Sequence, residues 1–135
     1  VDFAPTWLDL AGIEIPNYMQ GRSIRPLIQN KTPEDWTKVA YHRYWMNNDE
    51  IHEARAHYGV RTHQYKIIYW YYDGLGETGS RPDTLEPEWE LFDLEKDPLE
   101  LFNVYSDPAH AEVVTDMTKR LDAEMARIGD VPEHI

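Results

Sequence analysis

The sequence predicts an α+β fold: a small antiparallel sheet of about four strands, a long C-terminal helix packed on that sheet, and a short N-terminal helix. Strand-like segments follow one another between residues 39 and 94 without an intervening helical pattern, which is typical of antiparallel strands joined by loops. The last segment instead carries apolar residues at helical spacing. With 135 residues, the chain has the length of one domain, and we expect residues 1–135 to form a single domain.

The short N-terminal helix is expected over residues 3–11. Asp2 is the candidate N-cap, Pro5 lies in the first turn, and Gly12 follows the last apolar position. One side of this helix is apolar and needs a packing partner: Phe3, Trp7, Leu8 and Leu10. Residues 13–35 are interrupted by proline and glycine, so they are expected to form an irregular connection with no more than one helical turn.

Four segments favour strands because they are rich in Val, Ile, Tyr, Trp and Phe: Val39–Met46, His57–Thr62, Tyr65–Tyr72 and Glu88–Leu94. The second and third are separated by so few residues that they are expected to form a hairpin. Residues 73–87 are rich in Gly and Pro, which predicts a long surface loop.

The C-terminal helix is predicted to run from Asp107, its N-cap, to Ile128, with Pro108 at its first position and Gly129 after its end. One apolar stripe follows the helical repeat: Val113, Met117, Leu121, Met125 and Ile128. A stripe of this kind indicates that the helix packs on one face of the sheet.

The charge balance excludes several classes of partner. The chain has 13 Lys and Arg against 25 Asp and Glu, a formal net charge of −12, which argues against binding nucleic acid or anionic membranes. It has no Cys, so it holds no disulfide, thiolate metal site or Cys nucleophile. Its 5 Trp and 9 Tyr supply the large apolar areas that a folded core requires.

Histidine, arginine and aromatic residues in and beside the first two strands are the candidate site residues. His42, His52 and His57 lie near several carboxylates, but their spacing matches no metal signature, so we expect no metal site; they either line a cleft or serve a structural role. The planar fork of Arg61 suits a sulfate or a carboxylate, although an ion pair with one of the many acidic side chains is the alternative. Trp45 belongs to an aromatic run, with Tyr41, Tyr44 and residues 69–72, that forms either a sugar-stacking surface or part of the core.

Four blocks of the chain resemble, in order, the C-terminal part of type I sulfatases of the alkaline-phosphatase superfamily. Val1–Ile13 resembles the family's VD-x-x-PT-x-LDLAG helix, and Met19–Leu27 resembles the QG-x-SL-x-PLL segment that follows. His57–Ile68 resembles the GVRT-x-x-YKLI hairpin, and Trp89–Asn103 resembles the ELYDL-x-x-DP-x-E-x-x-N signature. One block alone is a weak signal, whereas four in register are a specific one.

The resemblance implies a parent enzyme that hydrolyses sulfate esters, often on sugars. It implies a formylglycine nucleophile, made from Cys or Ser in a C/S-x-P-x-R motif, and Ca²⁺, both in an N-terminal catalytic domain. Since this chain lacks that motif, we expect it to be an inactive C-terminal part that needs no cofactor of its own, completes the fold and lines the substrate cleft. The resemblance also favours a periplasmic or extracellular location.

Within that framework, the side chains expected to face the sulfated sugar are His52, His57, Tyr58, Arg61 and Trp45. The other expected partner is the N-terminal domain of the same polypeptide, and without it the apolar surfaces of the chain should favour self-association. Two other classes stay open: a free-standing carbohydrate-binding module with an aromatic stacking face, and an interaction module that recruits a basic protein through its acidic surface.

Overall fold

The computed structural model describes residues 1–134 and contains two compact units, Val1–Thr37 and Lys38–Ile135. The first unit contains the helix α1 (Phe3–Leu10) and the single helical turn α2 (Arg25–Ile28). The second contains the strands β1 (Ala40–Tyr44), β2 (His57–Arg61), β3 (Tyr65–Trp70) and β4 (Glu88–Asp93). They are followed by a 3₁₀ turn, η1 (Pro108–His110), and the helix α3 (Ala111–Ile128). The predicted α+β architecture is confirmed.

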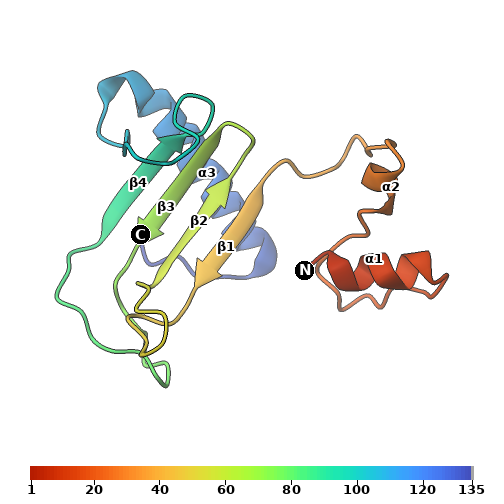
Figure 1. Cartoon of the computed structure of the whole chain (residues 1–135), viewed down its shortest axis with the longest axis horizontal. Helices are drawn as coiled ribbons and strands as arrows, with labels where there is room; N and C mark the ends of the chain where they lie inside the picture. The colour runs from red at the N-terminus through yellow and green to blue at the C-terminus, as the bar shows by residue number, and fades with distance from the viewer. Residues whose placement is uncertain (135) are drawn as a thin grey trace. The chain divides into compact units, whose positions relative to one another are not determined.

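The four strands form one antiparallel sheet in the order β1-β2-β3-β4, as consecutive strands joined by loops require (Figure 1). The register places His57 opposite both Tyr44 and Trp70, and Tyr58 opposite both Arg43 and Tyr69. Because neighbouring residues of a strand point to opposite faces, these two rows of side chains lie on opposite sides of the sheet.

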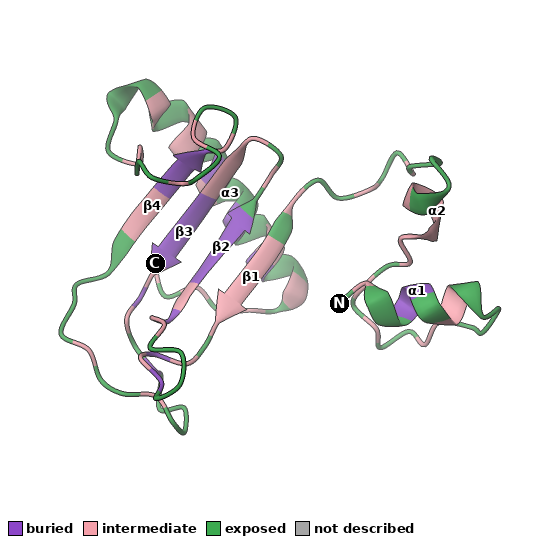
Figure 2. Ribbon diagram, viewed as in Figure 1, coloured by how far each residue is buried: buried purple, intermediate pink, exposed green. Residues whose placement is uncertain are grey.

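The core of this unit lies between the sheet and α3, which crosses the far side of the sheet in Figure 1. Val60, Ile67 and Leu91 from three strands meet Met117 and Leu121 of α3, and all five are almost fully buried. Figure 2 shows this burial concentrated along β2, β3 and β4. Three of the five residues of the predicted apolar stripe, Met117, Leu121 and Met125, are therefore at its centre.

The ends of the long helix form as its sequence indicates. Asp107 accepts a hydrogen bond from the backbone N–H of Ala109, although the first turn after it is 3₁₀ and α3 itself begins at Ala111. Gly129 ends the helix with φ of +75°, in the left-handed region that glycine adopts without strain. The exposed Asp116 pairs with Arg120 one turn later, at 2.7 Å.

The expectation that Asp2 caps α1 is wrong. Its backbone is already helical and its side chain makes no capping bond. Instead, the Asp2 carboxylate accepts a hydrogen bond from the backbone N–H of Arg22 at 2.8 Å. The carbonyl of Asp2 accepts from the hydroxyl of Thr6, which in turn accepts from the N–H of Ile24. These bonds tie α1 to the segment before α2 within the first unit, so the side chain of Asp2 serves a tertiary contact.

Candidate functional site

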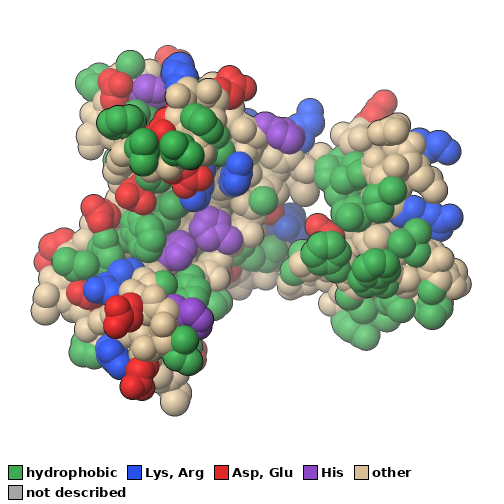
Figure 3. Space-filling view, viewed as in Figure 1, with side chains coloured by type: hydrophobic (Ala, Val, Ile, Leu, Met, Phe, Trp, Pro, Cys, Tyr) green, Lys and Arg blue, Asp and Glu red, His purple; other side chains and the backbone are tan. Residues whose placement is uncertain are grey.

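One face of the sheet carries polar and aromatic side chains and is not covered by α3. Strand alternation and register assign the following residues to this surface, which we call the outer face: His42, Tyr44, His57, Gly59, Arg61, Lys66, Ile68, Trp70, Glu88, Glu90 and Phe92. The space-filling view shows histidine side chains close together on the side of this unit that faces the viewer, beside Lys, Asp and Glu (Figure 3).

His57 lies at the centre of a row of rings that crosses three strands. Its ring centroid is 4.3 Å from that of Trp70 and 5.9 Å from that of Tyr44, which is nearly parallel to it. The Trp70 indole N–H donates to the carboxylate of Glu90 at 2.7 Å, which fixes the plane of the indole. The row is an apolar, ordered surface of the kind that sugar rings stack on.

A second histidine, His42, lies beside His57 with 5.4 Å between ring centroids. Gly59, opposite His42 on β2, leaves room for it, because a Cβ at Gly59 would come within 3.1 Å of His42 Cε1. Burial, followed by the nearby His57 and Lys66, lowers the pKa of His42 to about 4. Burial also lowers the pKa of His57. Both rings are therefore neutral near pH 7.

His52 comes from the β1–β2 connection and lies at the Tyr44 end of the row. Its Nδ1 is 3.1 Å from the Asp49 carboxylate and 3.4 Å from the Tyr44 hydroxyl. Asp49 accepts from that hydroxyl at 2.5 Å and from the backbone N–H groups of Ile51 and His52. The hydrogen bond from Tyr44, followed by these N–H groups, holds the pKa of Asp49 well below its usual range, so the carboxylate is ionised.

Arg61 lies at the other end of β2 from His57, on the outer face and exposed to solvent. It stands opposite Lys66, whose ammonium group pairs with Glu100. Among residues 1–134, no carboxylate lies within ion-pair distance of Arg61, so the alternative prediction of an ion pair finds no support in the described residues. Its guanidinium remains available to an anion.

Two of the predicted site residues, Tyr58 and Trp45, lie on the helix side of the sheet. Tyr58 is fully buried in the core, where its hydroxyl contacts His134 and accepts from the N–H of Glu133. Trp45 follows β1 and stacks over the guanidinium of Arg43, at 3.8 Å from the ring centroid. The structure thus brings His57 and His52 to the same end of the outer face and places Tyr58 and Trp45 elsewhere.

The outer face includes His42, Tyr44 and Trp70, which the sequence places among the candidate histidines and in the aromatic run but which were not selected as site residues. The signal that assigns them is the two-residue repeat of the strands, counted outward from His57 through the antiparallel register. That count requires the pairing of strands, which the sequence alone does not provide.

The loops at the His57 end of the sheet are joined by the fully buried Asn47. Its side-chain amide donates to the carbonyls of Tyr72 and Arg81, and its carbonyl accepts from the N–H of Ala56, each at 3.0 Å. Asn47 therefore links the β1–β2 connection to the loop that follows β3.

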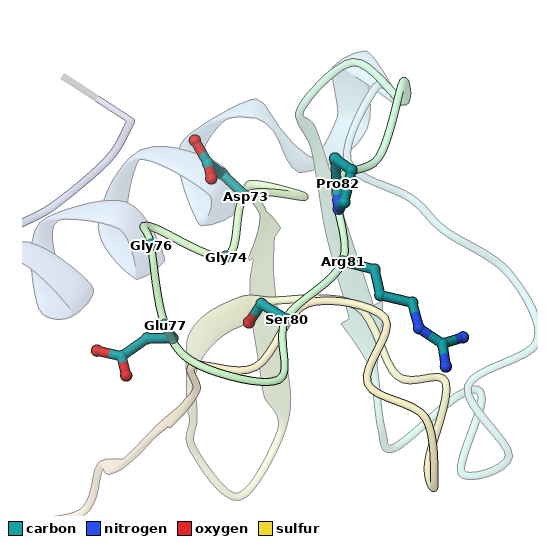
Figure 4. A pocket seen from close by; sticks show the side chains of 7 residues that line it. All are labelled: Asp73, Gly74, Gly76, Glu77, Ser80, Arg81 and Pro82. Atoms are coloured by element: carbon teal, nitrogen blue, oxygen red, sulfur yellow. The ribbon is translucent and has the colours of Figure 1, made fainter.

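A shallow cavity of about 370 Å³ lies within that loop, lined by residues 73–82 (Figure 4). The carboxylates of Asp73 and Glu77 point away from Arg81 and do not converge on a common point.

Among the described residues, no group of three or more His, Asp or Glu is placed to hold a metal ion. No helix in the same residues is long and apolar enough to cross a membrane.

Comparison with known proteins identifies the family. The model of N-sulphoglucosamine sulphohydrolase, C-terminal, matches residues 1–127. An N-acetylglucosamine-6-O-sulfatase of Bacteroides thetaiotaomicron is 36% identical over 96% of this chain and 21% of its own length. Arylsulfatase K of Rattus norvegicus is 33% identical over 98% of the chain and, again, 21% of its own length. This chain thus spans about a fifth of the length of these two relatives.

Solved structures agree with the sequence matches. A structure in complex with its substrate D-glucosamine-2-N,6-O-disulfate superposes with a TM-score of 0.78 and 35% identity over 93% of this chain and 23% of the other. A 2-O glycosaminoglycan sulfatase gives a TM-score of 0.72 over 96% of this chain and 25% of the other, but at 23% identity that likeness shows the fold alone. The resemblance to sulfatases is confirmed, and the chain belongs to the N-sulphoglucosamine sulphohydrolase C-terminal family.

Proposed function

We propose that this chain is the C-terminal part of a sulfatase that hydrolyses sulfate esters on a carbohydrate, with an amino sugar as the first substrate to test. The observation that carries the proposal is the 36% identity to an N-acetylglucosamine-6-O-sulfatase over nearly the whole chain. The structural neighbour with 35% identity, whose substrate is a disulfated glucosamine, supports the same class.

The residues of this chain do not fit the nucleophile or the metal that such a sulfatase requires. There is no Cys, and no Ser stands in an S-x-P-x-R sequence. Among residues 1–134, no carboxylates and imidazoles gather as a metal site would need. We assign formylglycine and Ca²⁺ to an N-terminal catalytic domain of the same polypeptide, and we derive no chemical step from this chain.

Its proposed role is to line the sugar side of the cleft with the outer face. Neutral imidazoles at His42 and His57 can hydrogen bond to hydroxyl groups, and the Trp70 indole can stack on a sugar ring. His52 and Arg61 remain in the proposal as contacts at the two ends of this surface. Tyr58 and Trp45 are left out because they lie on the helix side of the sheet.

The test begins with the coding sequence upstream of Val1, where the proposal expects a C/S-x-P-x-R motif and acidic metal-binding segments. The full-length protein, matured in a host that produces formylglycine, should then release sulfate from glucosamine 6-sulfate. A reading frame without that motif, or a mature protein that releases no sulfate from a panel of sulfated amino sugars, would contradict the proposal.

The proposed partner within the polypeptide is the catalytic domain, and α1 supplies part of the surface that would meet it. Phe3 is 71% exposed, Trp7 65% and Leu10 51%, an apolar surface that a soluble protein normally covers. Residues 1–135 produced alone should therefore self-associate and bind a hydrophobic dye. A monodisperse monomer in light scattering, without dye binding, would count against this docking surface.

A further inference from the structure

One hydrogen bond fixes which nitrogen of His57 carries the proton. The ring Nδ1 lies 2.7 Å from the backbone carbonyl oxygen of Arg55. A carbonyl oxygen only accepts, so Nδ1 must be the N–H donor. In a neutral imidazole the other nitrogen, Nε2, then holds a lone pair and acts as an acceptor.

The carbonyl that orients His57 belongs to a well-anchored residue. The Arg55 guanidinium pairs with Asp83, Nε to Oδ2 at 2.6 Å, and donates to the side chain of Asn48 at 2.7 Å and to the carbonyl of Glu53 at 2.8 Å. These contacts hold the end of the β1–β2 connection to the long loop before β4. The orientation of the imidazole is therefore preorganised by the protein and does not depend on a ligand.

The surroundings of the ring keep it neutral and leave Nε2 accessible. Burial is the main reason that the pKa of His57 is lowered, and Lys66 lowers it further, while the Arg55 carbonyl and Glu90 oppose the shift. The other groups that face the ring are aromatic or neutral: His42, Tyr44 and Trp70. His57 is only partly buried, and its Nε2 makes no hydrogen bond within residues 1–134, so this nitrogen is open to a ligand.

We propose that His57 Nε2 is a specificity-determining acceptor for a hydroxyl or amino N–H of the sugar, and that His57 does not bind the sulfate group. This inference rests on the proposed sulfatase function. It adds that, in one hydrogen bond to the sugar, the protein is the acceptor and the sugar is the donor. A lone pair attracts a donor and repels the oxygen atoms of a sulfate. The neighbouring Trp70 ring offers the sugar an apolar face at the same place.

The experiment uses the full-length enzyme, glucosamine 6-sulfate, and analogues that each lack one hydroxyl or the amino group. For the wild type, one analogue should lose about fivefold in kcat/KM, the size of one neutral hydrogen bond. His57→Leu should lose a similar factor on the parent sugar and should no longer distinguish that analogue. His57→Gln, whose amide oxygen can accept, should retain most of the discrimination, whereas His57→Lys, which only donates, should not.

A matched control is His63→Leu, because His63 is exposed in the β2–β3 turn, away from the row of rings. Its kinetics should equal those of the wild type. The KM of the wild type should also stay constant from pH 7 to 8, where the lowered pKa of His57 keeps the ring neutral. His57→Gln serves as a second variant if His57→Leu fails to fold.

The possible failures separate the two proposals. A wild-type enzyme that releases no sulfate contradicts the sulfatase function itself. Normal wild-type turnover, together with unchanged kinetics and unchanged discrimination in His57→Leu and His57→Gln, overturns the role of Nε2 alone. A lower KM in His57→Lys also overturns it, because that result means that a positive charge at this position binds the sulfate.

Discussion

Tyr58 in β2 and His134 near the end of the chain meet through a bond of 2.6 Å, although they are 76 positions apart. Nε2 of His134 is 3.0 Å from the Asp122 carboxylate, which accepts its hydrogen. In a neutral imidazole Nδ1 is then the acceptor and the Tyr58 hydroxyl the donor, while the same hydroxyl accepts from the N–H of Glu133. These hydrogen bonds hold the segment after α3 against the helix side of the sheet.

We expect the loss of this bond to destabilise the domain. Tyr58→Phe leaves the buried nitrogen of His134 without its donor and should cost about 1–2 kcal/mol in the free energy of unfolding. His134→Ala also removes a ring that contacts Tyr58, Tyr69 and Trp89, and should cost about 2–3 kcal/mol. Urea unfolding measures both, with the exposed His63→Ala as the control. Equal midpoints for all four proteins would contradict the fastening role.

A second prediction concerns Gly59, whose lack of a side chain permits the close approach of β2 and β3. A Cβ at this position would lie 2.2 Å from the carbonyl oxygen of Ile67, which is backbone and has no room to move within the sheet. Gly59→Ala should therefore cost about 3 kcal/mol or more. Gly76→Ala is the comparison, since its Cβ meets nothing within 4 Å and only its φ of +79° opposes the change, by about 1 kcal/mol. Similar costs for the two variants would rule out this steric reason.

The elements of the fold could be predicted because each has a local signal. The β-branched and aromatic composition of β3, the stripe of α3 and the cap at Asp107 are each read from residues a few positions apart, and the element that each predicts appears in the structure. The predicted N-cap at Asp2 is wrong for the opposite reason. Its carboxylate accepts a hydrogen bond from the backbone N–H of Arg22, twenty positions away, and not from the first turn of its own helix. Local patterns do not reveal such competition between partners.

The candidate site was less predictable, because it depends on which face of the sheet the helix covers. His57 and Tyr58 are adjacent in the sequence, so in a strand they cannot share a face. The sequence alone does not decide which of them lies under α3, and grouping both as cleft residues ignored the alternation. The decision comes from long-range contacts, among them the packing of Tyr58 against the segment that carries His134.

The pH dependence of stability should report on His42. The pKa of His42 is about 4 in the folded chain and near 6.5 in the unfolded chain. Between these pH values the unfolded chain therefore binds a proton that the folded chain does not. The free energy of unfolding should then fall as the pH decreases from about 6.5 to 4, and this contribution should be constant above 6.5. His57 acts in the same direction, because its pKa is also lowered.

His42→Gln removes this titration, so the difference in unfolding midpoint between wild type and variant should change between pH 7.5 and 4.5. Carboxylates titrate in the same range, and the comparison with the variant cancels their effect. Direct titration of the His42 ring by NMR gives the second measurement. A ring that titrates near pH 6.5 in the folded protein would contradict both the burial of His42 and its neutrality on the outer face.

The last prediction concerns Asn47, which holds together the loops beside the outer face. Asn47→Ala leaves the N–H of Ala56 without its buried acceptor and the carbonyls of Tyr72 and Arg81 without their donor. Each unmade bond of this kind costs about 1–3 kcal/mol, so the loops should open long before the sheet unfolds.

Asn47→Asp distinguishes the effect of lost hydrogen bonds from the effect of lost side-chain volume. The carboxylate can still accept from Ala56 but faces two carbonyl oxygens, so this nearly isosteric change should open the loops as readily as Asn47→Ala does. Amide hydrogen exchange should show faster exchange in residues 45–56 and 71–83, with the centre of β3 unchanged. Asn103→Ala is an instructive contrast, because Asn103 makes a similar set of bonds to Trp89, Leu91 and Tyr105 on the opposite edge of the sheet. That variant should speed exchange near β4 and leave residues 45–56 protected, and the same pattern in both variants would mean that Asn47 has no local role.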